Sequence, residues 1–403
     1  MFEDEPLATA YNMPAIDDLP EPARPLRIAL FSGNYNYQRD GANQALNHLV
    51  GFLESRGNTV RVYSPTSDTP AFPPAGKLVS APSFRIPGRA DYRIALPLSA
   101  ALKRDIRDFA PDIVHLSAPD PLNHSAKKLA RTMGVPVVAS FHTRFDTYFE
   151  YYGAGWFLGA ARGIMRRFYA GLDEVFVTSE GFGALLHEQG LIERSAVWSR
   201  GVDKLRFNPG KRDLAWRRSL GIADGDVVIG FVGRLVLEKG LDVVAGAIAE
   251  LQRRDVPHKL LVVGDGLARA HFEAGVPGAV FTGFLEGEKL ARAFASFDML
   301  LNPSTTETFG NINLEAMASG IPVVAAIATG SNCLIEDGAN GTLVPPGDIA
   351  AFADALALYL TNPAARTAAG ANGLARAAGY DWENINGAVL DRYHAILAAR
   401  VAA

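Results

Sequence analysis

The organisation of this chain is clearest in the stretch STTETFGNINLEAMASGIPVVA, Ser304 to Ala325. Two glutamates, Glu307 and Glu315, stand eight positions apart in it, with a Gly-Asn pair between them. Apolar residues gather only after that pair, which favours a loop at Glu307 and a helix that contains Glu315. We place the helix start between Phe309 and Asn311, so that Glu315 lies about one turn inside the helix.

A helix start beside two carboxylates suits a polyhydroxylated, anionic ligand. The backbone N–H groups around Thr308, Phe309, Gly310 and Asn311 would be free to bind negative charge, helped by the positive end of the helix dipole. The carboxylates would accept hydrogen bonds from hydroxyl groups. On the spacing alone, an acidic cap on a core helix is an equally good interpretation.

Short apolar runs rich in valine and isoleucine alternate with helical patterns, and this rhythm occurs twice. The first set of predicted strands covers residues 27–32, 59–63, 112–116, 135–141 and 174–179, with helices at 42–55, 97–109 and 122–133. The second set of strands covers residues 227–233, 259–264, 279–283, 298–303, 322–326 and 341–345. Continuous apolarity means that both sheet faces are covered, as in parallel α/β sheets. The sequence predicts two Rossmann-like, doubly wound domains whose strand carboxyl ends face one crevice.

The composition argues against several classes of protein. A net charge of −4 does not fit broad nucleic-acid binding, which needs a concentrated basic surface. The single cysteine, Cys333, cannot form an internal disulfide and fits a reducing cytoplasm; we expect a small buried residue rather than a nucleophile. No stretch reaches the ~18 apolar residues that a membrane span needs. We expect a cytoplasmic protein that at most lies on the inner membrane surface.

The helix predicted from Trp156 to Leu172 bears on membrane contact. It joins bulky apolar residues to Arg162, Arg166 and Arg167. A basic amphipathic surface of this kind could rest on anionic lipid. A core helix with solvated arginines is the more ordinary interpretation, and we favour it.

Two cations follow the first strand of the second set, in the sequence GRLVLEKG. Arg234 comes directly after the strand and Lys239 stands five residues later. Fixed positive charges at the carboxyl edge of a sheet would stabilise a leaving diphosphate, on which negative charge grows as its bond breaks. Solvated charges on a surface loop are the alternative, but the buried strand and the adjoining Gly233 and Gly240 favour the binding role.

A histidine, His142, follows the fourth predicted strand in the sequence SFHT. A side chain just past a strand's carboxyl end faces the crevice, although a histidine that caps the next helix is an alternative. After the first strand, the loop SGNYNYQRDGANQ (32–44) places Gly41 at a helix start, where backbone N–H groups could bind a phosphate. Its tyrosines, Tyr35 and Tyr37, could instead contact an acceptor.

Together these segments resemble glycosyltransferase family 4, whose members have the GT-B fold, use nucleotide-sugar donors and retain the configuration of the transferred sugar. The likeness rests on the E-x7-E of ETFGNINLEAMASG, on G-R-x4-K-G, on S-x-H-T, and on the turns VVGDG and TGFLE, which flank the nucleotide base in the family. It spans roughly Arg27 to Pro346. The sequence around the two glutamates is most similar to that of enzymes with lipid-linked acceptors, the α-mannosyl-, glucosyl- and sulfoquinovosyl-transferases.

The resemblance implies a role for each site residue. Glu307 would bind hydroxyls of the donor sugar, Glu315 the ribose, and His142 the sugar near its reacting carbon. Arg234 and Lys239 would stabilise the departing diphosphate. Further donor contacts would come from Gly41, Gly264, Asp265, Gly266, Phe284, Leu285, Thr308, Phe309, Gly310 and Asn311. Family members often have paired glycines in the first loop where this chain has only Gly41, and the two turns could equally be ordinary strand-to-helix connections.

Domain limits follow from length and from the same resemblance. A chain of 403 residues exceeds what one hydrophobic core usually serves. The polar, turn-rich segment 200–212 is the expected linker between a first domain, 26–204, and a second domain, 205–381. Residues 1–25 would form a flexible tail. The helix in 382–403 would cross back onto the first domain, as the last helix of GT-B enzymes does.

We therefore expect a hexosyltransferase that moves sugar from a UDP- or GDP-sugar to a hydroxyl of a lipid-linked or glycan acceptor. No metal or other cofactor is expected, because the D-x-D of Asp224 and Asp226 lies in an Asp-Gly-Asp turn before a strand. The alternatives are a nucleotide-sugar epimerase or hydrolase of the same fold and a non-catalytic nucleotide-sugar binder. The base, the hexose, the acceptor and the oligomeric state stay open.

Overall fold

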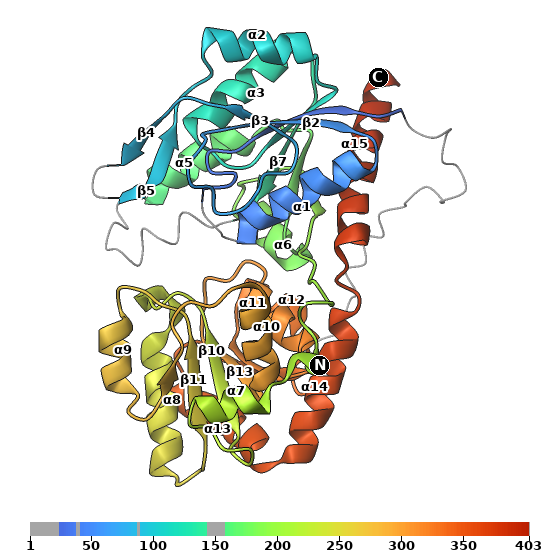
Figure 1. Cartoon of the computed structure of the whole chain (residues 1–403). Coiled ribbons are helices and arrows are strands. Elements are labelled where there is room, and N and C mark those ends of the chain that lie inside the picture. The colour runs from blue at the N-terminus through green and yellow to red at the C-terminus, as the bar shows by residue number, and fades with distance from the viewer. Residues whose placement is uncertain (1–23, 38–40, 87–88, 143–157, 403) are drawn as a thin grey trace.

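The computed structural model describes residues 24–37, 41–86, 89–142 and 158–402. Two α/β domains face each other in Figure 1, each built on its own sheet, and the last helix of the chain runs alongside the first domain. The predicted tail, 1–25, lies almost entirely outside the described residues. In the part of the chain that is described, no helix is both long and apolar enough to cross a bilayer.

The first domain is built on a seven-stranded parallel sheet in the order β3-β2-β1-β6-β7-β8-β9. Its strands are β1 (Arg27–Phe31), β2 (Thr59–Ser64), β3 (Lys77–Ser80), β6 (Ile113–Leu116), β7 (Val137–Phe141), β8 (Glu174–Val177) and β9 (Ser195–Val197). The side chains of successive β1 residues pack into different hydrophobic cores, one on each face of the sheet. Ala29 and Phe31 pack beneath α2 (Ala100–Phe109), α3 (Pro121–Met133), α5 (Leu158–Tyr169) and α6 (Glu180–Glu188), whereas Ile28 and Leu30 pack beneath α1 (Gly41–Ser55).

The second domain is built on a six-stranded parallel sheet in the order β12-β11-β10-β13-β14-β15. Its strands are β10 (Val228–Val232), β11 (Lys259–Val263), β12 (Val280–Phe281), β13 (Met299–Asn302), β14 (Val323–Ala326) and β15 (Gly341–Val344). Its helices are α7 (Leu214–Ser219), α8 (Leu241–Arg253), α9 (Arg269–Gly275), α10 (Gly287–Ser296), α11 (Asn311–Ala318), α12 (Thr329–Leu334), α13 (Ile349–Thr361) and α14 (Pro363–Ala377). Apolar clusters fill both faces of this sheet as well. The prediction of two doubly wound parallel sheets is confirmed.

Some elements were not predicted from the sequence. The outer strands β3 and β9 are only four and three residues long and lack a continuous apolar run. The antiparallel hairpin of β4 (Ser83–Ile86) and β5 (Arg89–Ala95) stands outside both large sheets. Phe84 and Ile94 face each other across that hairpin and stay about half exposed and 37% exposed, respectively.

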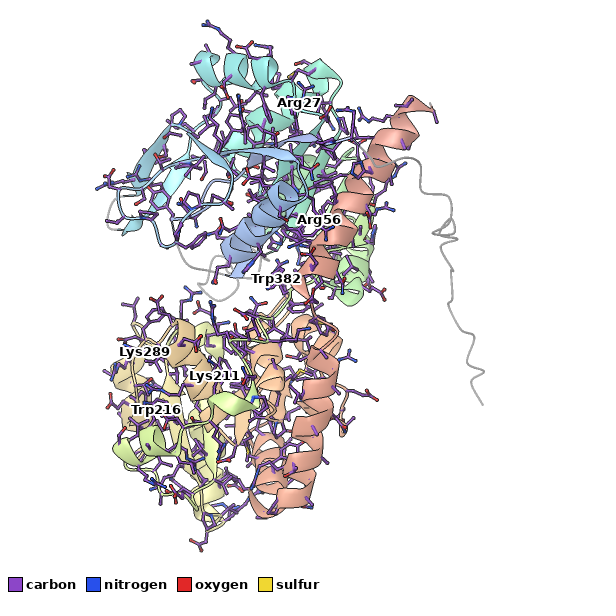
Figure 2. All side chains as sticks on the ribbon, turned by 45° about the vertical axis from the view of Figure 1, so that its right-hand side comes forward. Arg27, Arg56, Lys211, Trp216, Lys289 and Trp382 are labelled. Atoms are coloured by element: carbon purple, nitrogen blue, oxygen red, sulfur yellow. The ribbon has the colours of Figure 1, made fainter. Side chains whose placement is uncertain are left out.

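The last helix, α15 (Trp382–Val401), packs against α1 of the first domain. Its Tyr393 is fully buried there and bonds through its hydroxyl to the Nδ1 atom of His115 over 2.5 Å. Arg392 holds both carboxylate oxygens of Glu174, at 2.7 and 2.5 Å. Figure 2 shows Trp382 at the level where the two domains meet, and its ring stacks on His48 of α1. The exact limits of the domains stay a prediction.

Candidate active site

Loops that follow the carboxyl ends of strands in the two sheets contact each other. Thr308, after β13, donates from its hydroxyl to the carbonyl of His142, after β7, over 2.8 Å. The carbonyl of Thr308 in turn accepts a hydrogen bond from the hydroxyl of Thr178, after β8, over 2.7 Å. Gly41 opens α1 and lies against Asn311, which opens α11; a Cβ atom at Gly41 would be 2.4 Å from the Asn311 amide. The strand ends of both sheets and two helix N-termini therefore meet in one place.

An ion pair spans the switch point of the second sheet, where neighbouring β10 and β13 are followed by strands on opposite sides. Lys239, after β10, donates to Glu307, after β13, over 2.5 Å, and the two side chains are 21% and 18% exposed. Burial alone would raise the pKa of Glu307. The charge and hydrogen bond of Lys239, the Ser304 hydroxyl and the charge of Arg234 together outweigh burial and lower that pKa. Glu307 is therefore ionised at neutral pH.

Close glycine contacts fix the loop that carries Arg234. A Cβ atom at Gly264 would lie 1.9 Å from the carbonyl oxygen of Gly233, and one at Gly266 would lie 2.4 Å from that of Leu235. Gly264 also has φ +139°, a conformation that side chains disfavour. Only glycine lets these two strand-end loops approach so closely. The guanidinium of Arg234 is left exposed beside Glu307, with no hydrogen bond or ion pair to any described residue.

Helix α11 begins where it was predicted to begin, beside Gly41 of the first domain, and carries Glu315 in its second turn. Gly310, at φ +87°, precedes the helix, and no side chain caps the helix start. Glu315 is half-buried, and burial raises its pKa to about 8 although the charge of Arg206 opposes this. Phe309 is a core residue, because its ring packs edge-on against Tyr380 and is 4% exposed. Phe309 can therefore contribute only its backbone to a ligand site.

His142 is held by a residue that the sequence did not point to, Arg200. The Arg200 guanidinium donates to Nδ1 of His142 over 2.6 Å and is itself anchored on the carbonyls of Trp198 and Ser199, each at 3.2 Å. The Nε2 atom of His142 is buried and has no partner among the described residues. Burial, then the charge of Arg200, then that of His115 hold the pKa of His142 well below its usual range. His142 is therefore neutral, with one ring nitrogen left for a ligand.

Gly330 is a second supporting residue that the sequence did not reveal. Its N–H donates to the carbonyl of Glu307 over 2.9 Å. A Cβ atom there would lie 2.6 Å from the backbone nitrogen of Phe309 and 2.7 Å from the carbonyl oxygen of Glu307. The start of α12 thus lies directly against the loop that carries Glu307. Gly330 has no unusual φ and belongs to no recognised motif, so only the folded chain reveals this contact.

The turns expected near a nucleotide base adjoin the same edge of the sheet. Asp265 caps its own turn, accepting from the N–H of Gly266 over 2.8 Å. Phe284 follows β12 with its ring 68% exposed, whereas Leu285 packs partly into the core. An exposed aromatic ring at this edge offers a stacking surface. The ring of Phe284, rather than its backbone alone, is thus accessible to a base.

One of the two loop tyrosines does not face the crevice. Tyr35 is fully buried in the first domain, and its hydroxyl donates to the side chain of Asn47 and to the carbonyl of Ala75. The suggestion that it contacts an acceptor is wrong, because its ring fills the core beneath α1. Tyr37 is only partly buried and donates to the carbonyl of Thr66.

The D-x-D acids lie before β10, at the edge of the sheet opposite to this site. Asp224 forms a two-pronged ion pair with Arg218, and Asp226 accepts from the N–H of Ala223. Among the described residues, no three His, Cys, Asp or Glu side chains converge as metal ligands. Cys333 packs in the core, and burial raises the pKa of its thiol to about 11. Independence from metal stays a prediction.

Known proteins identify this arrangement. The chain matches the domain described as "Glycosyltransferase Family 4" over residues 39–206 and "Glycosyl transferases group 1" over residues 226–362. It is 34% identical over 329 residues to a GDP-mannose-dependent alpha-mannosyltransferase of Mycobacterium tuberculosis, covering 80% of this chain and 85% of that protein. The chain belongs to glycosyltransferase family 4. This glycosyltransferase is also 31% identical over 372 residues to a sulfoquinovosyl transferase of Arabidopsis thaliana, covering 89% of this chain and 72% of the relative.

Solved structures agree with the fold of this glycosyltransferase. The sucrose-phosphate synthase of Thermosynechococcus elongatus superposes with a TM-score of 0.77 at 21% identity, covering 93% of this chain and all of that one. The family and the fold make the chain a hexosyltransferase with the GT-B fold, as predicted.

Proposed function

We propose that this glycosyltransferase moves a hexose from a UDP- or GDP-sugar to a hydroxyl of a lipid-linked or glycan acceptor, with retention of configuration and without metal. One observation carries the proposal. Two cations, the carboxylate of Glu307 and a neutral histidine meet where the strand carboxyl ends of both sheets converge, and Glu315 lies on the helix that begins there. GDP-mannose is the first donor to test, because a relative that shares 34% of aligned residues is named for it.

In this proposal the donor lies mainly on the second domain. Its diphosphate takes the N–H groups at the start of α11 and the charges of Arg234 and Lys239. Lys239 then exchanges the carboxylate of Glu307 for a phosphate oxygen, which frees Glu307 to accept from sugar hydroxyls. Glu315 accepts from the ribose hydroxyls. The ion pair seen between Lys239 and Glu307 is thus the arrangement that precedes donor binding.

The histidine would contact the same sugar from the first domain. Because Arg200 donates to Nδ1, the single proton of neutral His142 lies on Nε2, which becomes a hydrogen-bond donor. That N–H is buried and unpaired among the described residues, so a ligand oxygen there would relieve the cost of its desolvation. We assign this oxygen to a hydroxyl of the donor sugar.

The transfer step needs no group beyond these and the two substrates. The bond between the anomeric carbon and the β-phosphate oxygen breaks, and the nucleoside diphosphate leaves with the electron pair. The acceptor oxygen bonds to the anomeric carbon on the same face and passes its proton to an oxygen of the departing phosphate. Arg234, Lys239 and the helix N-termini stabilise the charge that grows on the diphosphate, and they thereby lower the barrier.

A panel of UDP- and GDP-sugars, read by thermal shift, tests the donor, because a ligand bound to the native state alone raises the melting temperature. The best donor is then incubated with lipid and glycan acceptors, and the product's anomeric configuration is read by NMR. Rapid consumption of donor without acceptor would instead indicate an epimerase or hydrolase. Glu307→Ala should abolish transfer while leaving nucleoside diphosphate affinity mostly intact; lost nucleotide affinity would remove the sugar-binding role from Glu307.

A further inference from the structure

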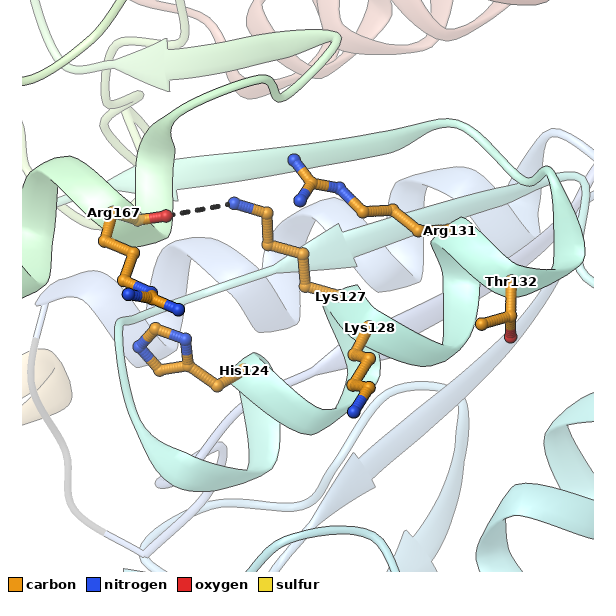
Figure 3. A pocket seen from close by; sticks show the side chains of 6 residues that line it. All are labelled: His124, Lys127, Lys128, Arg131, Thr132 and Arg167. Carbon is orange, nitrogen blue, oxygen red and sulfur yellow. Dashed lines mark hydrogen bonds between the residues drawn. The ribbon is translucent and has the colours of Figure 1, made fainter.

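A basic pocket lies between α3 and α5 on the first domain, apart from the loops of the candidate active site. Its volume is about 380 Å³. Figure 3 shows side chains along one stretch of α3, with Arg167 of α5 facing them. The lining residues are His124, Lys127, Lys128, Arg131, Thr132 and Arg167. We call this set the α3–α5 pocket.

The cations of the α3–α5 pocket form no ion pair within the described part of the chain, although the charge of Glu193 acts on Lys127. None of Lys127, Lys128, Arg131 and Arg167 forms an ion pair with a carboxylate of the described residues, although the chain has 43 acidic and 39 basic residues. The chain as a whole has no excess of basic residues, so its overall composition does not explain this cluster of positive charge. An anion in the pocket would remove this repulsion.

Two of the cations are held rigidly. The Lys127 ammonium donates to the carbonyls of Arg167, Phe168 and Ala170 at the end of α5, at 3.3, 2.5 and 2.9 Å. Arg131 donates from one nitrogen to the carbonyl of Ala170 over 3.1 Å and has further N–H groups to offer. Burial, with the charge of Arg131, lowers the pKa of Lys127 to about 8, and Glu193 offsets this only partly.

The other groups remain available to a ligand. Lys128 and Arg167 are exposed and make no side-chain hydrogen bond to any described residue. His124 is half-buried with its ring edge-on to Phe168, and burial, then Lys127 and Arg167, lower its pKa. A neutral imidazole between cations can donate to or accept from an anion that carries a proton or an ester oxygen.

We propose that the α3–α5 pocket binds a phosphate group, as free phosphate, a phosphorylated small molecule or a phospholipid headgroup. Forked guanidinium donors and a point-charge ammonium are the groups that recognise phosphate oxygens. The proposal is independent of the donor chemistry proposed above.

The test compares the wild type with Lys128→Ala/Arg167→Ala, which removes the two exposed cations and leaves the anchored ones. Lys211→Ala/Arg218→Ala is the matched control, because it removes the same charge from ion pairs on the second domain. One arm titrates inorganic phosphate by calorimetry. The other sediments the protein with phosphatidylcholine vesicles, with and without phosphatidylglycerol. Circular dichroism confirms that both variants are folded.

We expect the pocket variant to lose about tenfold in affinity in at least one arm, whereas the control keeps wild-type affinity. A loss in the calorimetric arm alone assigns the site to free phosphate or a phosphorylated small molecule. A loss confined to vesicles with phosphatidylglycerol assigns it to a lipid headgroup. Equal affinity of pocket variant and control in both arms, or no binding by the wild type in either, would overturn the proposal.

Discussion

Arg200 donates a hydrogen bond to the Nδ1 atom of His142 over 2.6 Å, and the two residues stand 58 positions apart in the sequence. A guanidinium has donors only, so the histidine must keep a lone pair on Nδ1 and carry its proton on Nε2. Arg200 therefore sets the tautomer of the histidine, and its charge adds to burial in lowering the pKa of the histidine. It acts on the reaction through His142, as a positioning residue.

Replacing Arg200 with glutamine should lower turnover about tenfold, the effect of roughly 1.4 kcal/mol from one hydrogen bond. It should also raise the pKa of His142, because the neighbouring positive charge that lowers it is gone. The acid limb of kcat/KM against pH would then move to higher pH. Arg200→Lys, which keeps charge and donor, should move the limb back. A slower enzyme with an unshifted profile would assign Arg200 a purely structural role.

Arg234→Ala and Lys239→Ala should each lower kcat by roughly 10²–10³, the cost typical of one preorganised charge stabiliser. Arg253→Ala is the matched control, because its guanidinium is exposed and pairs with Glu250 on the outer helix α8. Steady-state rates with the best donor check this. Wild-type turnover in either of the first two variants would remove that residue from the site.

Nucleotide binding should release a proton through Glu315. Its pKa of about 8 keeps it protonated at pH 7, whereas ribose hydroxyls that donate to it favour the ionised form. Calorimetry with UDP or GDP in buffers of different ionisation enthalpy should detect release of up to about one proton. Glu315→Gln should bind more weakly and release none. Equal proton release by the variant would point to another group.

The raised pKa of Glu315 also predicts how the folding stability changes with pH. An acid whose pKa is raised on folding favours the native state at low pH, and this contribution declines as pH rises from its unfolded value through about 8. Without ligand, Glu315→Gln should therefore gain stability relative to the wild type at pH 8 more than at pH 5. Denaturant titrations at the two pH values check this, and the opposite trend would contradict a buried, neutral Glu315.

Gly264→Ala should destabilise the second domain by several kcal/mol, because its Cβ would lie 1.9 Å from a backbone oxygen that cannot move freely. Gly278→Ala is the matched control: it has φ +87° and nothing within 4 Å, so it should cost only about 1 kcal/mol of backbone strain. Urea unfolding of both variants separates the effects. Similar midpoints would mean that the loops beside Arg234 are not held by this contact.

The sequence predicted the positions of most central strands and the start of α11. Central strands such as β10 and β13 are covered on both faces, so their continuous apolar runs marked them to within about a residue or two. The start of α11 was predicted correctly because Gly310 breaks the pattern just before the apolar residues begin. The edge strands β3 and β9 of the first sheet carry no comparable signal, because neither contains a fully buried residue.

Contacts between distant segments could not be predicted in this way. The partnership of Arg200 with His142 depends on how the linker packs against β7, and no spacing encodes it. The sequence pattern was compatible with one basic surface formed by the arginines of α5. In the folded chain they face different neighbours. Arg166 donates to the carbonyl of Gly190 over 3.0 Å, whereas Arg167 faces α3. The basic pocket became visible only once α3 and α5 were placed side by side.

Hydrogen exchange with bound nucleotide tests the central claim most directly. At saturating UDP or GDP, one of the two should slow exchange of the backbone amides in Gly264–Gly266 and Phe309–Asn311, while amides at the opposite sheet edge near Asp224 are unchanged. Protection confined to other segments, or none with either nucleotide, would contradict a donor site built on the second domain around Glu307 and Glu315.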